Sequence, residues 1–266
     1  MTKEIIFLKL GGSLITDKDK PYTPRLDKLA ELAQEIKAAL DSNPSLLLIL
    51  GHGSGSFGHV AAKKHGTRDG VKTREQWFGF TEVRFQAAEL NRYLVQSLLE
   101  AGLPALPFPP SASMVSNDRK VVHHNIEPIR KALDVNLLPV VQGDVAFDEV
   151  RGGTILSTED VFAFLAEHFS PSRILLAGIE AGVWEGFPAR TKRVNEIQLS
   201  DYEKMRAGIG GSASTDVTGG MKAKVEEMLA LLQKSKGMTA QIFSAEEKGF
   251  LTRALNGENV GTLLKV

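Results

Sequence analysis

A glycine-rich segment that follows a strongly apolar run restricts the fold of this chain more than any other feature of its sequence. The run 45–50 reads SLLLIL, which predicts a strand buried on both faces of a parallel sheet. Glycine lets backbone amides approach an anion closely, and a helix that begins near residue 58 would direct free N–H groups to the same point. We therefore expect a phosphate site, with two histidines as further donors, in the segment that contains Gly51, His52, Gly53, Gly55, Gly58 and His59.

The same glycines satisfy the pattern G-x-G-x-x-G of dinucleotide-binding folds. Such a unit has a crossover of about 30 residues and an acidic residue about 20 positions further on. Here the next predicted strand begins only at Ala105, Asp69 is too near, and Glu82 lies in a helical pattern. A dinucleotide site is therefore disfavoured. A tight turn without any ligand remains an alternative, although a bare turn does not need four glycines and two histidines.

Strand and helix signals alternate along the whole chain, which predicts a mostly parallel sheet with helices on both faces. A chain of 266 residues with 42% hydrophobic residues can bury one large core, and no linker or repeat divides it. We expect a single domain of two lobes over residues 1–266. The expected strands are 5–10, 45–50, 105–108, 137–141, 173–176, 239–243 and 260–264, with a hairpin at 144–156, and the expected helices are 23–40, 59–64, 75–101, 158–168 and 219–234.

The charge balance and the residue usage disfavour several classes of protein. Lysine plus arginine and aspartate plus glutamate each number 32, so no nucleic-acid surface is expected. With no cysteine, the chain has no disulfide, cysteine-ligated zinc or thiol nucleophile. No apolar run approaches the roughly 18 residues of a membrane span, and residues 1–4 lead directly into a strand without a signal-peptide pattern. We therefore expect a cytoplasmic protein that binds neither nucleic acid nor membrane.

A second glycine segment follows the first predicted strand. Lys9 ends that strand, and the amides of Gly11, Gly12 and Ser13 could hold a phosphate beside its ammonium group. Lys18 lies on the same loop. The alternative is an ordinary glycine loop with a solvated lysine.

A third glycine segment, DVTGGMKAK at residues 216–224, turns into a predicted helix. Gly219 lies at the start of this helix, and Lys222 and Lys224 lie in its first turns, where an anion is favoured. A plain flexible connection before this helix is the alternative.

Three anion sites that each contain a basic residue favour phosphoryl transfer, because that reaction depends on positioning and on neutralising spread-out charge. The chain lacks the P-loop pattern G-x-x-x-x-G-K-[ST] and the H-R-D loop of protein kinases. Asp160, in the segment LSTED, is the carboxylate expected to hold two of the lysines in place. The alternative is that Asp160 is an acid in the first turn of a helix, where it complements the helix dipole.

The order of these motifs resembles the amino acid kinase superfamily. The resemblance rests on Lys-x-Gly-Gly-Ser at 9–13, the glycine loop, Ser-x-x-Asp at 157–160 and the segment 216–224. Within the superfamily the chain is similar to the isopentenyl phosphate kinases, through GSFGH at 55–59, ITDK at 15–18, LNR at 90–92, PPS at 109–111 and GDV at 143–145. The similarity extends over nearly the whole chain.

The resemblance implies a three-layer α/β/α sandwich around a mostly parallel sheet, and a homodimer. It implies an acceptor lobe at about 1–170 and an ATP lobe at about 171–266, with Mg²⁺ carried by ATP and no metal site of the protein itself. The implied reaction is ATP-dependent phosphorylation of isopentenyl phosphate. A kinase of another phosphate or phosphonate, such as fosfomycin, and a non-catalytic nucleotide-binding relative are the alternatives.

The resemblance also implies roles for individual residues. His59 binds the acceptor phosphate; Lys9, Lys18 and Lys224 stabilise the transferring phosphoryl group; Asp160 organises these lysines. The implied ATP contacts are Lys9, Gly11, Gly12, Ser13, Gly55, Gly178, Gly219 and Lys224, and the implied acceptor contacts are Ser54, Gly55, His59 and Thr158.

Two segments depart from the pattern of the resembled family. Ser54 stands where three consecutive glycines are usual, and a serine has less backbone freedom. The segment Ala177-Gly178-Ile179-Glu180 replaces the usual Thr-Asp-Val-Asp, so different nucleoside contacts are expected.

The acceptor's hydrocarbon tail requires an apolar pocket. Helical spacing puts Trp77, Phe80, Val83 and Ala87 on one stripe just after the phosphate loop, where they could close a five-carbon pocket. The alternative is that they only pack in the core.

Overall fold

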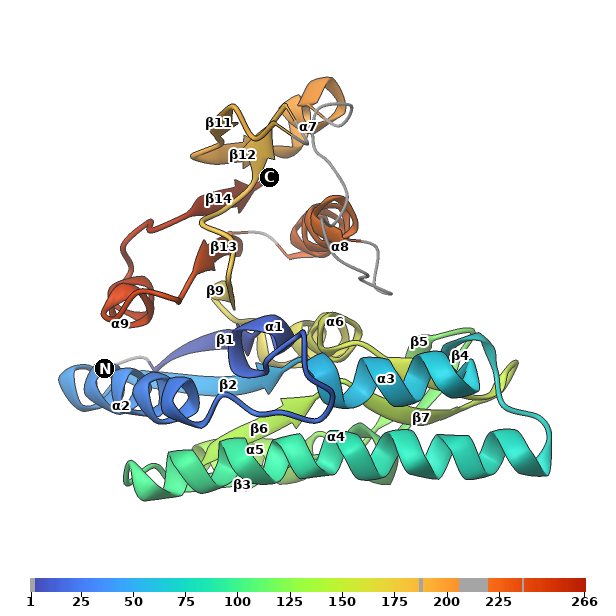
Figure 1. Ribbon diagram of the computed structural model, residues 1–266. Coiled ribbons are helices and arrows are strands. Elements are labelled where there is room, and N and C mark those ends of the chain that lie inside the picture. Colours follow the sequence, from blue (N-terminus) through green and yellow to red (C-terminus); the bar gives the residue numbers. More distant parts are fainter. Residues whose placement is uncertain (1–2, 187–188, 206–219, 236) are drawn as a thin grey trace.

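The computed structural model describes residues 3–186, 189–205, 220–235 and 237–266, and an eight-stranded sheet forms its centre (Figure 1). The strand order is β12-β14-β13-β9-β1-β2-β6-β3, and every described pairing in it is parallel except that of β13 with β14. The mostly parallel sheet that the sequence predicts is therefore confirmed. The strands are β1 (Glu4–Leu10), β2 (Leu46–His52), β3 (Ala105–Pro107), β6 (Leu138–Gln142), β9 (Arg173–Gly178), β12 (Glu196–Gln198), β13 (Thr239–Ser244) and β14 (Thr262–Lys265).

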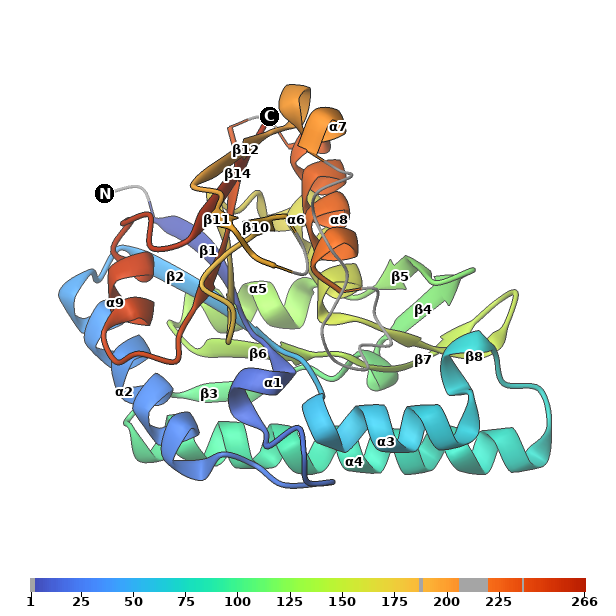
Figure 2. The same cartoon turned by 45° about the horizontal axis from the view of Figure 1, so that its top comes forward.

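Helices cover both faces of this sheet, because side chains along β1 alternate between two hydrophobic cores. Ile6 and Leu8 belong to the core that also contains apolar residues of α1 (Gly12–Ile15), α2 (Leu26–Ser42), α4 (Arg74–Glu100) and α9 (Phe250–Leu255). Phe7 belongs to the opposite core, with residues of α5 (Glu127–Asp134), α6 (Thr158–Phe169), α7 (Leu199–Met205) and α8 (Gly220–Lys234). The remaining helix, α3 (Gly55–His65), lies alongside α4 (Figure 2). These layers confirm the predicted α/β/α sandwich.

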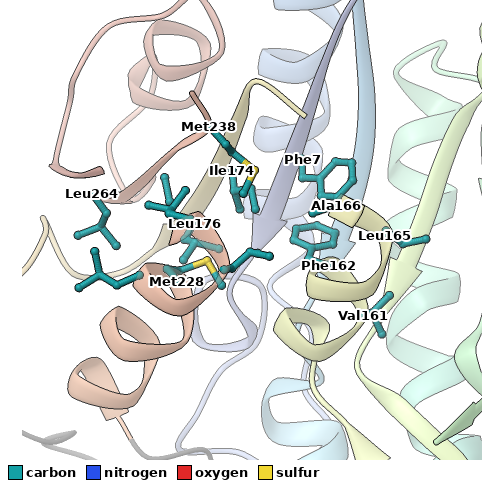
Figure 3. Close-up of a cluster of buried hydrophobic side chains, with 14 of the residues drawn as sticks. Phe7, Val161, Phe162, Leu165, Ala166, Ile174, Leu176, Met228, Met238 and Leu264 are labelled. Atoms are coloured by element: carbon teal, nitrogen blue, oxygen red, sulfur yellow. The ribbon is translucent and has the colours of Figure 1, made fainter. Parts of the chain in front are cut away.

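The core between the sheet and α6 contains two aromatic rings in contact, with their planes tilted by 45°. Phe7 of β1 and Phe162 of α6 have their ring centroids 5.0 Å apart, and both side chains are fully buried (Figure 3). Ile174 and Leu176 of β9 and Met228 of α8 belong to the same cluster. This core therefore joins the first part of the chain to the last strands and helices.

Two smaller sheets lie outside the central one. One has the order β5-β4-β7-β8, and its β7–β8 pair confirms the hairpin predicted at 144–156. The strands β4 and β5 are short and were not predicted. The helix α5 was not predicted either, although its buried residues Ile129, Ala132 and Leu133 recur at helical spacing. The elements are β4 (Met114–Asn117), β5 (Lys120–His124), β7 (Asp144–Asp148), β8 (Gly152–Leu156), the pair β10 (Trp184–Glu185) and β11 (Lys192–Arg193), and the 3-10 turns η1 (Thr67–Asp69) and η2 (Pro110–Ala112).

Two predicted helix starts are wrong. The helix α2 begins at Leu26 rather than at residue 23, because Pro24 pairs with Thr16 in an isolated β-bridge. The hydroxyl of Thr23 donates to the carbonyl of Pro21 instead of capping the helix. The helix α3 begins at Gly55 rather than near residue 58, so its N-terminus lies directly after the glycine loop.

The strand order brings the predicted phosphate loops to one edge of the sheet. β1 lies between β2 and β9, and Lys9 is in register with Gly51 on one side and Leu176 on the other. From β1 the sheet extends through β2 on one side and through β9 and β13 on the other, so the order of the strands reverses at β1. Open α/β sheets bind ligands at the carboxyl ends of the strands at such a point. Among the described residues, no helix has both the length and the apolar character needed to cross a bilayer.

Candidate active site

A cavity of about 1020 Å³ lies at the carboxyl ends of β1, β2 and β9. Most of the residues that the sequence singles out line it together: Lys9, Gly11, Gly12, Ser13, Lys18, Ser54, Gly55, His59, Thr158, Gly178 and Lys224. Asp160 is absent from this wall, and its neighbour Glu159 is present. Gly219 lies outside the described residues.

Two glycine loops cross at the centre of the cavity with their backbones in direct contact. A Cβ on Gly12 would lie 2.3 Å from the backbone nitrogen of Gly55, so no larger residue fits there without moving the loop. Gly55 has φ +49°, and a Cβ on it would lie 2.2 Å from the hydroxyl oxygen of Thr16. Thr16 joins the loops, because its hydroxyl donates to the carbonyl of Gly12 and accepts from the N–H of Ser56. Packing alone therefore requires glycine at both positions.

Four backbone amides of these loops remain available for an anion. Within the described residues, the N–H groups of Gly12, Ser13, Ser54 and Gly55 have no hydrogen-bond partner. The expected amide contact from Gly11 is wrong, because its N–H donates to the carbonyl of Ala177 at 2.8 Å and so joins β1 to the end of β9.

Ser54 is accommodated without backbone strain. Its φ of −80° and ψ of −12° are ordinary for any residue, so the loss of a glycine at this position costs little. Its hydroxyl donates to the carbonyl of Gly143 at 3.1 Å. Its Cβ occupies the space next to Gly58, where a second Cβ would approach it to 2.3 Å.

The carboxylate that pairs with a lysine of the cavity is Glu159. It forms an ion pair with Lys9, and the two side chains are only 7% and 13% exposed. Burial opposes ionisation of this carboxyl, yet the ammonium groups of Lys9 and Lys224 hold the pKa of Glu159 below its ordinary value. Glu159 is therefore charged and lies between two cations that come from β1 and α8.

The role predicted for Asp160 is wrong in this structure. Asp160 is the third residue of α6 and forms a capping box with Ser157: its carboxylate accepts from the N–H and the hydroxyl of Ser157, both at 2.8 Å. Its own N–H donates to the hydroxyl of Ser157 at 3.0 Å. Asp160 therefore stabilises the start of the helix that carries Glu159.

The two histidines of the loop differ completely in environment. His52 is fully buried; its Nδ1 donates to the carbonyl of Gly53, and its Nε2 accepts from the amide of Asn91 at 2.9 Å. Burial lowers the pKa of His52 to about 4, so it is neutral and has no donor left for a phosphate. The expectation that either histidine could serve as a donor is therefore wrong for His52. His59 is half-buried and lines the cavity from the second turn of α3, not from its start.

Thr158 cannot donate its hydroxyl hydrogen to an acceptor molecule in this arrangement. That hydroxyl already donates to the carbonyl of His52 at 2.7 Å and is buried. The methyl group of Thr158 packs beside Phe162 at the position where a Cβ on Gly51 would lie, which explains the glycine at the end of β2. The role of Thr158 seen here is to join α6 to β2.

An apolar wall continues the cavity beyond His59. Val83 and Ala87 of α4 line it, together with Ala62, Ile155 and Leu156. Trp77 and Phe80 do not line the cavity; they form an aromatic cluster with Phe147, with ring centroids 5.1 to 5.7 Å apart. Of the predicted stripe, two members therefore face the cavity and two support it from behind.

A buried acid at the start of β7 was not singled out as a site residue. Asp144 lines the cavity with a fully buried side chain, accepts from the hydroxyl of Ser111 at 2.8 Å and lies 3.4 Å from Nε of Arg84. Burial raises the pKa of Asp144 despite these partners. Its signals in the sequence are its position shortly after a buried strand and its place in the GDV motif at 143–145, to which no role was assigned.

The opposite end of the cavity is lined by Ala177, Gly178, Ile179, Glu180, Met221, Ile242 and Phe243. A Cβ on Gly178 would meet no atom of the described residues within 4 Å, so none of their packing requires glycine there. Glu180 pairs with Arg190 through two hydrogen bonds of 2.8 and 3.0 Å. This end is therefore apolar, with one carboxylate held at its rim.

The arrangement combines unpaired amides, Lys9 and Lys224 beside the carboxylate of Glu159, and an apolar wall on either side. Such a cavity can hold two phosphate-bearing molecules with their phosphates together and their apolar parts apart. Negative charge that passes between the two would be neutralised by lysines from both directions.

A comparison with protein families matches residues 4–244 to the amino acid kinase family. The isopentenyl phosphate kinase of Methanocaldococcus jannaschii is 34% identical over 266 residues, which cover 97% of this chain and 97% of that protein. The isopentenyl phosphate kinase of Methanothermobacter thermautotrophicus is 33% identical over 264 residues, 96% of this chain and 97% of that protein.

Solved structures agree in fold. One X-ray structure of an isopentenyl phosphate kinase has a TM-score of 0.83 and 29% identity and covers 98% of this chain and 100% of its own. The product complex of the T. acidophilum isopentenyl phosphate kinase has a TM-score of 0.77 over the same shares of both chains, and at 22% identity it supports the fold alone.

Proposed function

This chain belongs to the amino acid kinase family, and on that premise we propose that it transfers the γ-phosphoryl group of ATP to isopentenyl phosphate, forming isopentenyl diphosphate and ADP. The observation that carries this proposal is the ion pair of Lys9 with Glu159, with Lys224 close to the same carboxylate. The cavity that this ion pair lines also contains the unpaired loop amides and the apolar wall with Val83 and Ala87. A phosphoryl-transfer site needs this neutralising charge, and a five-carbon acceptor needs the apolar wall.

We propose that the acceptor's phosphate lies against the amides of Ser54 and Gly55 and the ring of His59. An oxygen of this phosphate attacks the γ-phosphorus of ATP, the bond from that phosphorus to the bridging oxygen breaks, and ADP leaves with the bond electrons. The attacking oxygen is already ionised near neutral pH, so no side chain has to remove a proton. Lys9, Lys18 and Lys224 then act by stabilising charge on the moving phosphoryl group.

We propose that residues of about 1–170 bind the acceptor and residues of about 171–266 bind ATP. The apolar wall with Val83 and Ala87 supports the first assignment, and the wall with Gly178 and Ile179 supports the second. The open space at Gly178 fits a nucleoside that passes close to the backbone of β9.

Mg²⁺ is implied as the companion of ATP, and when bound it would neutralise charge on the nucleotide's phosphates. Within the described residues, no group of three histidine, aspartate or glutamate side chains is placed to hold a metal ion. Glu159, the carboxylate nearest the lysines, is already paired with Lys9. We therefore assign the metal to the nucleotide's phosphates and give it no protein ligand.

We further propose a homodimer that works in the cytoplasm, where ATP is available, and that serves isoprenoid biosynthesis. Support for self-association comes from β3, which is the last strand at one edge of the described sheet. Leu99 and Leu106 are 55% and 41% exposed there, and a groove of about 390 Å³ runs between α4 and Pro107.

A coupled assay of ADP release tests the proposed reaction and its alternatives together. Purified protein with ATP and Mg²⁺ would be given isopentenyl phosphate, fosfomycin or no acceptor. We expect rapid ADP release with isopentenyl phosphate alone. Release with fosfomycin alone would identify a phosphonate kinase, and release in no arm would identify a nucleotide-binding protein without transfer activity.

A further inference from the structure

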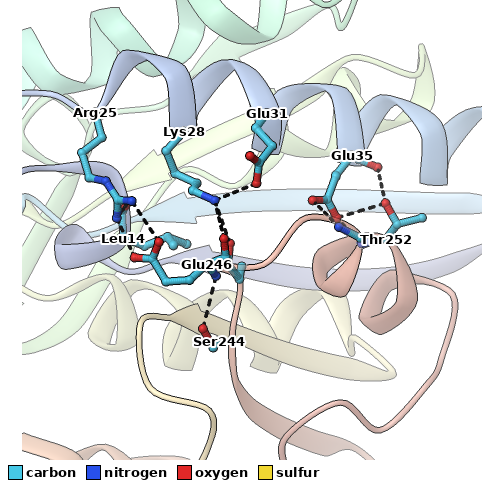
Figure 4. A network of polar contacts seen from close by, with 10 residues as sticks. Leu14, Arg25, Lys28, Glu31, Glu35, Ser244, Glu246 and Thr252 are labelled. Atoms are coloured by element: carbon cyan, nitrogen blue, oxygen red, sulfur yellow. Dashed lines mark hydrogen bonds and ion pairs between the residues drawn. The ribbon is translucent and has the colours of Figure 1, made fainter.

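A network of ion pairs and hydrogen bonds joins the start of α2 to the segment between β13 and α9, outside the cavity (Figure 4). Both guanidinium η-nitrogens of Arg25 donate to the carboxylate of Glu246, at 2.6 and 2.9 Å. Lys28, which is nearly buried, donates to the carbonyl of Glu246 at 2.7 Å. Two turns further along α2, Glu35 accepts from the N–H groups of Gly249 and Thr252.

The Arg25–Glu246 pair lies at the base of the loop that carries Lys18. We call this base, residues 14–17 together with 23–25, the neck of the loop. Arg25 also donates to the carbonyl of Leu14 at 3.0 Å, and its backbone N–H donates to the carbonyl of Ile15 at 2.9 Å. The N–H of Asp17 donates to the carbonyl of Thr23 at 2.9 Å, next to the bridge between residues 16 and 24. Lys18 directly follows the neck in the chain, so a shift of the neck would also shift the backbone of Lys18.

The other side of the network reaches the wall of the cavity. Ala245, next to Glu246, donates its N–H to the carbonyl of Gly178 at 2.9 Å. Gly178 lines the cavity at the end where we propose that ATP binds. A short path of direct contacts therefore runs from the Lys18 loop, through Arg25 and Glu246, to the nucleotide side.

The solvent exposure of the Arg25–Glu246 pair indicates that the pair fixes the position of the loop more than it stabilises the fold. The side chains of Arg25 and Glu246 are 33% and 34% exposed, and ion pairs with this much solvent around them contribute little to global stability. Two parallel hydrogen bonds from one guanidinium to one carboxylate nevertheless fix both direction and distance. A lysine in place of Arg25 could not reproduce that geometry.

We infer that the Arg25–Glu246 pair, supported by Lys28, is a positioning clamp that holds the neck of the Lys18 loop against the C-terminal strands. The inference rests on the proposed function, because it assigns the clamp the task of aligning Lys18 with the transferred phosphoryl group. Arg25 and Glu246 are positioning residues: neither lines the cavity, and both act through Lys18 and Gly178.

The test compares Arg25→Gln, Arg25→Lys and Glu246→Gln with Lys37→Gln. Lys37 lies on the same helix and forms an exposed ion pair with Asp41, far from the neck in sequence, so it is a matched control. Steady-state kinetics with ATP and isopentenyl phosphate would be measured beside thermal melts. Hydrogen–deuterium exchange of a peptide that covers residues 14–24 would report on the neck without any need for activity.

We expect each clamp variant to lower kcat about tenfold or more, since a small misplacement of a charge-neutralising group is costly, while KM for isopentenyl phosphate stays within about threefold. Exchange at the amide of Asp17 should rise, and the melting temperature should hardly change. The double variant Arg25→Glu with Glu246→Arg should recover part of the kcat that Arg25→Glu loses. Lys37→Gln should match the wild type in every measurement.

Wild-type kcat together with wild-type exchange in Arg25→Gln would overturn the inference, as would a lower melting temperature with unchanged kcat. These outcomes leave the proposed function intact. A wild-type protein without activity on isopentenyl phosphate would instead overturn the proposed function, and the exchange measurement would still decide whether Arg25 holds the neck.

Discussion

The exchange of roles between Glu159 and Asp160 gives the sharpest prediction, because these two adjacent carboxylates contact different groups. Glu159→Gln removes the negative charge between Lys9 and Lys224 and nearly preserves the side chain's size. Asp160→Asn removes a charge one residue along and keeps an oxygen that can accept from Ser157. The two variants therefore form a matched pair.

The magnitudes follow from the contacts. Without its counter-charge, Lys9 has no fixed position in a site where a single preorganised charge-stabilising group is worth about 10²- to 10³-fold in kcat. We expect Glu159→Gln to lose activity in that range, with KM for ATP changed much less. Asp160→Asn weakens a helix cap worth about 0.5–2 kcal/mol, or a few degrees in melting temperature at about 2–4 °C per kcal/mol, with kcat within about threefold of the wild type.

Initial rates of ADP release at varied ATP and isopentenyl phosphate, beside thermal melts, give both quantities. Glu159→Gln could also lower stability, because one partner of a largely buried ion pair is left alone; the melts identify a folded variant before its rates are compared. The reasoning is refuted if folded Glu159→Gln keeps wild-type kcat, or if Asp160→Asn is the variant that loses activity.

Further predictions concern the histidines, a lysine and the apolar wall. His59→Ala should lower kcat/KM for isopentenyl phosphate about 10- to 100-fold, the worth of one charge-assisted hydrogen bond, and an unchanged value would reject the acceptor contact. Lys224→Ala should lower kcat more than it raises KM for ATP; a change in KM alone would make it a nucleotide anchor. Val83→Ala should admit geranyl phosphate, whereas Phe80→Ala should chiefly lower stability, by about 3–5 kcal/mol, as thermal melts would show. The pKa of His52 is about 4 in the fold, below its unfolded value, so its stabilising contribution is complete above about pH 6.5 and decreases as the pH falls towards 4. Urea unfolding should show a loss of about 2 kcal/mol from this group between pH 7 and pH 5, and His52→Asn should remove that part of the pH dependence.

The sequence was sufficient to predict the sheet and the convergence of its loops. Parallel strands bring their carboxyl ends to one edge, so the glycine segments that follow β1 and β2 had to meet there. Lys9, Lys18, His59 and Lys224 therefore line one cavity, as expected.

The sequence could not show which hydrogen-bond donors are already bonded to other groups of the protein. The amide of Gly11 and the hydroxyl of Thr158 are typical phosphate donors, yet the first is bonded across to β9 and the second to β2. Both partners are distant in sequence. The pattern that drew attention to Asp160 is also the pattern of a capping box, and the orientation of Glu159 towards Lys9 depends on how α6 packs on β1.

Helix boundaries failed for a related reason. Thr23 and Pro24 form a good local start signal for a helix, but the pairing of Pro24 with Thr16 delays α2 to Leu26. That delay creates the neck of the Lys18 loop. A contact across eight residues therefore overrides the local preference.

Transfer of label from γ-³²P-ATP to isopentenyl phosphate tests the central claim most directly. With the wild-type protein, the label should appear in isopentenyl diphosphate in equal amount to the ADP formed, and Glu159→Gln should lower the rate of this transfer about 10²-fold or more. Label that appears only as inorganic phosphate, or that reaches fosfomycin but not isopentenyl phosphate, would contradict the account.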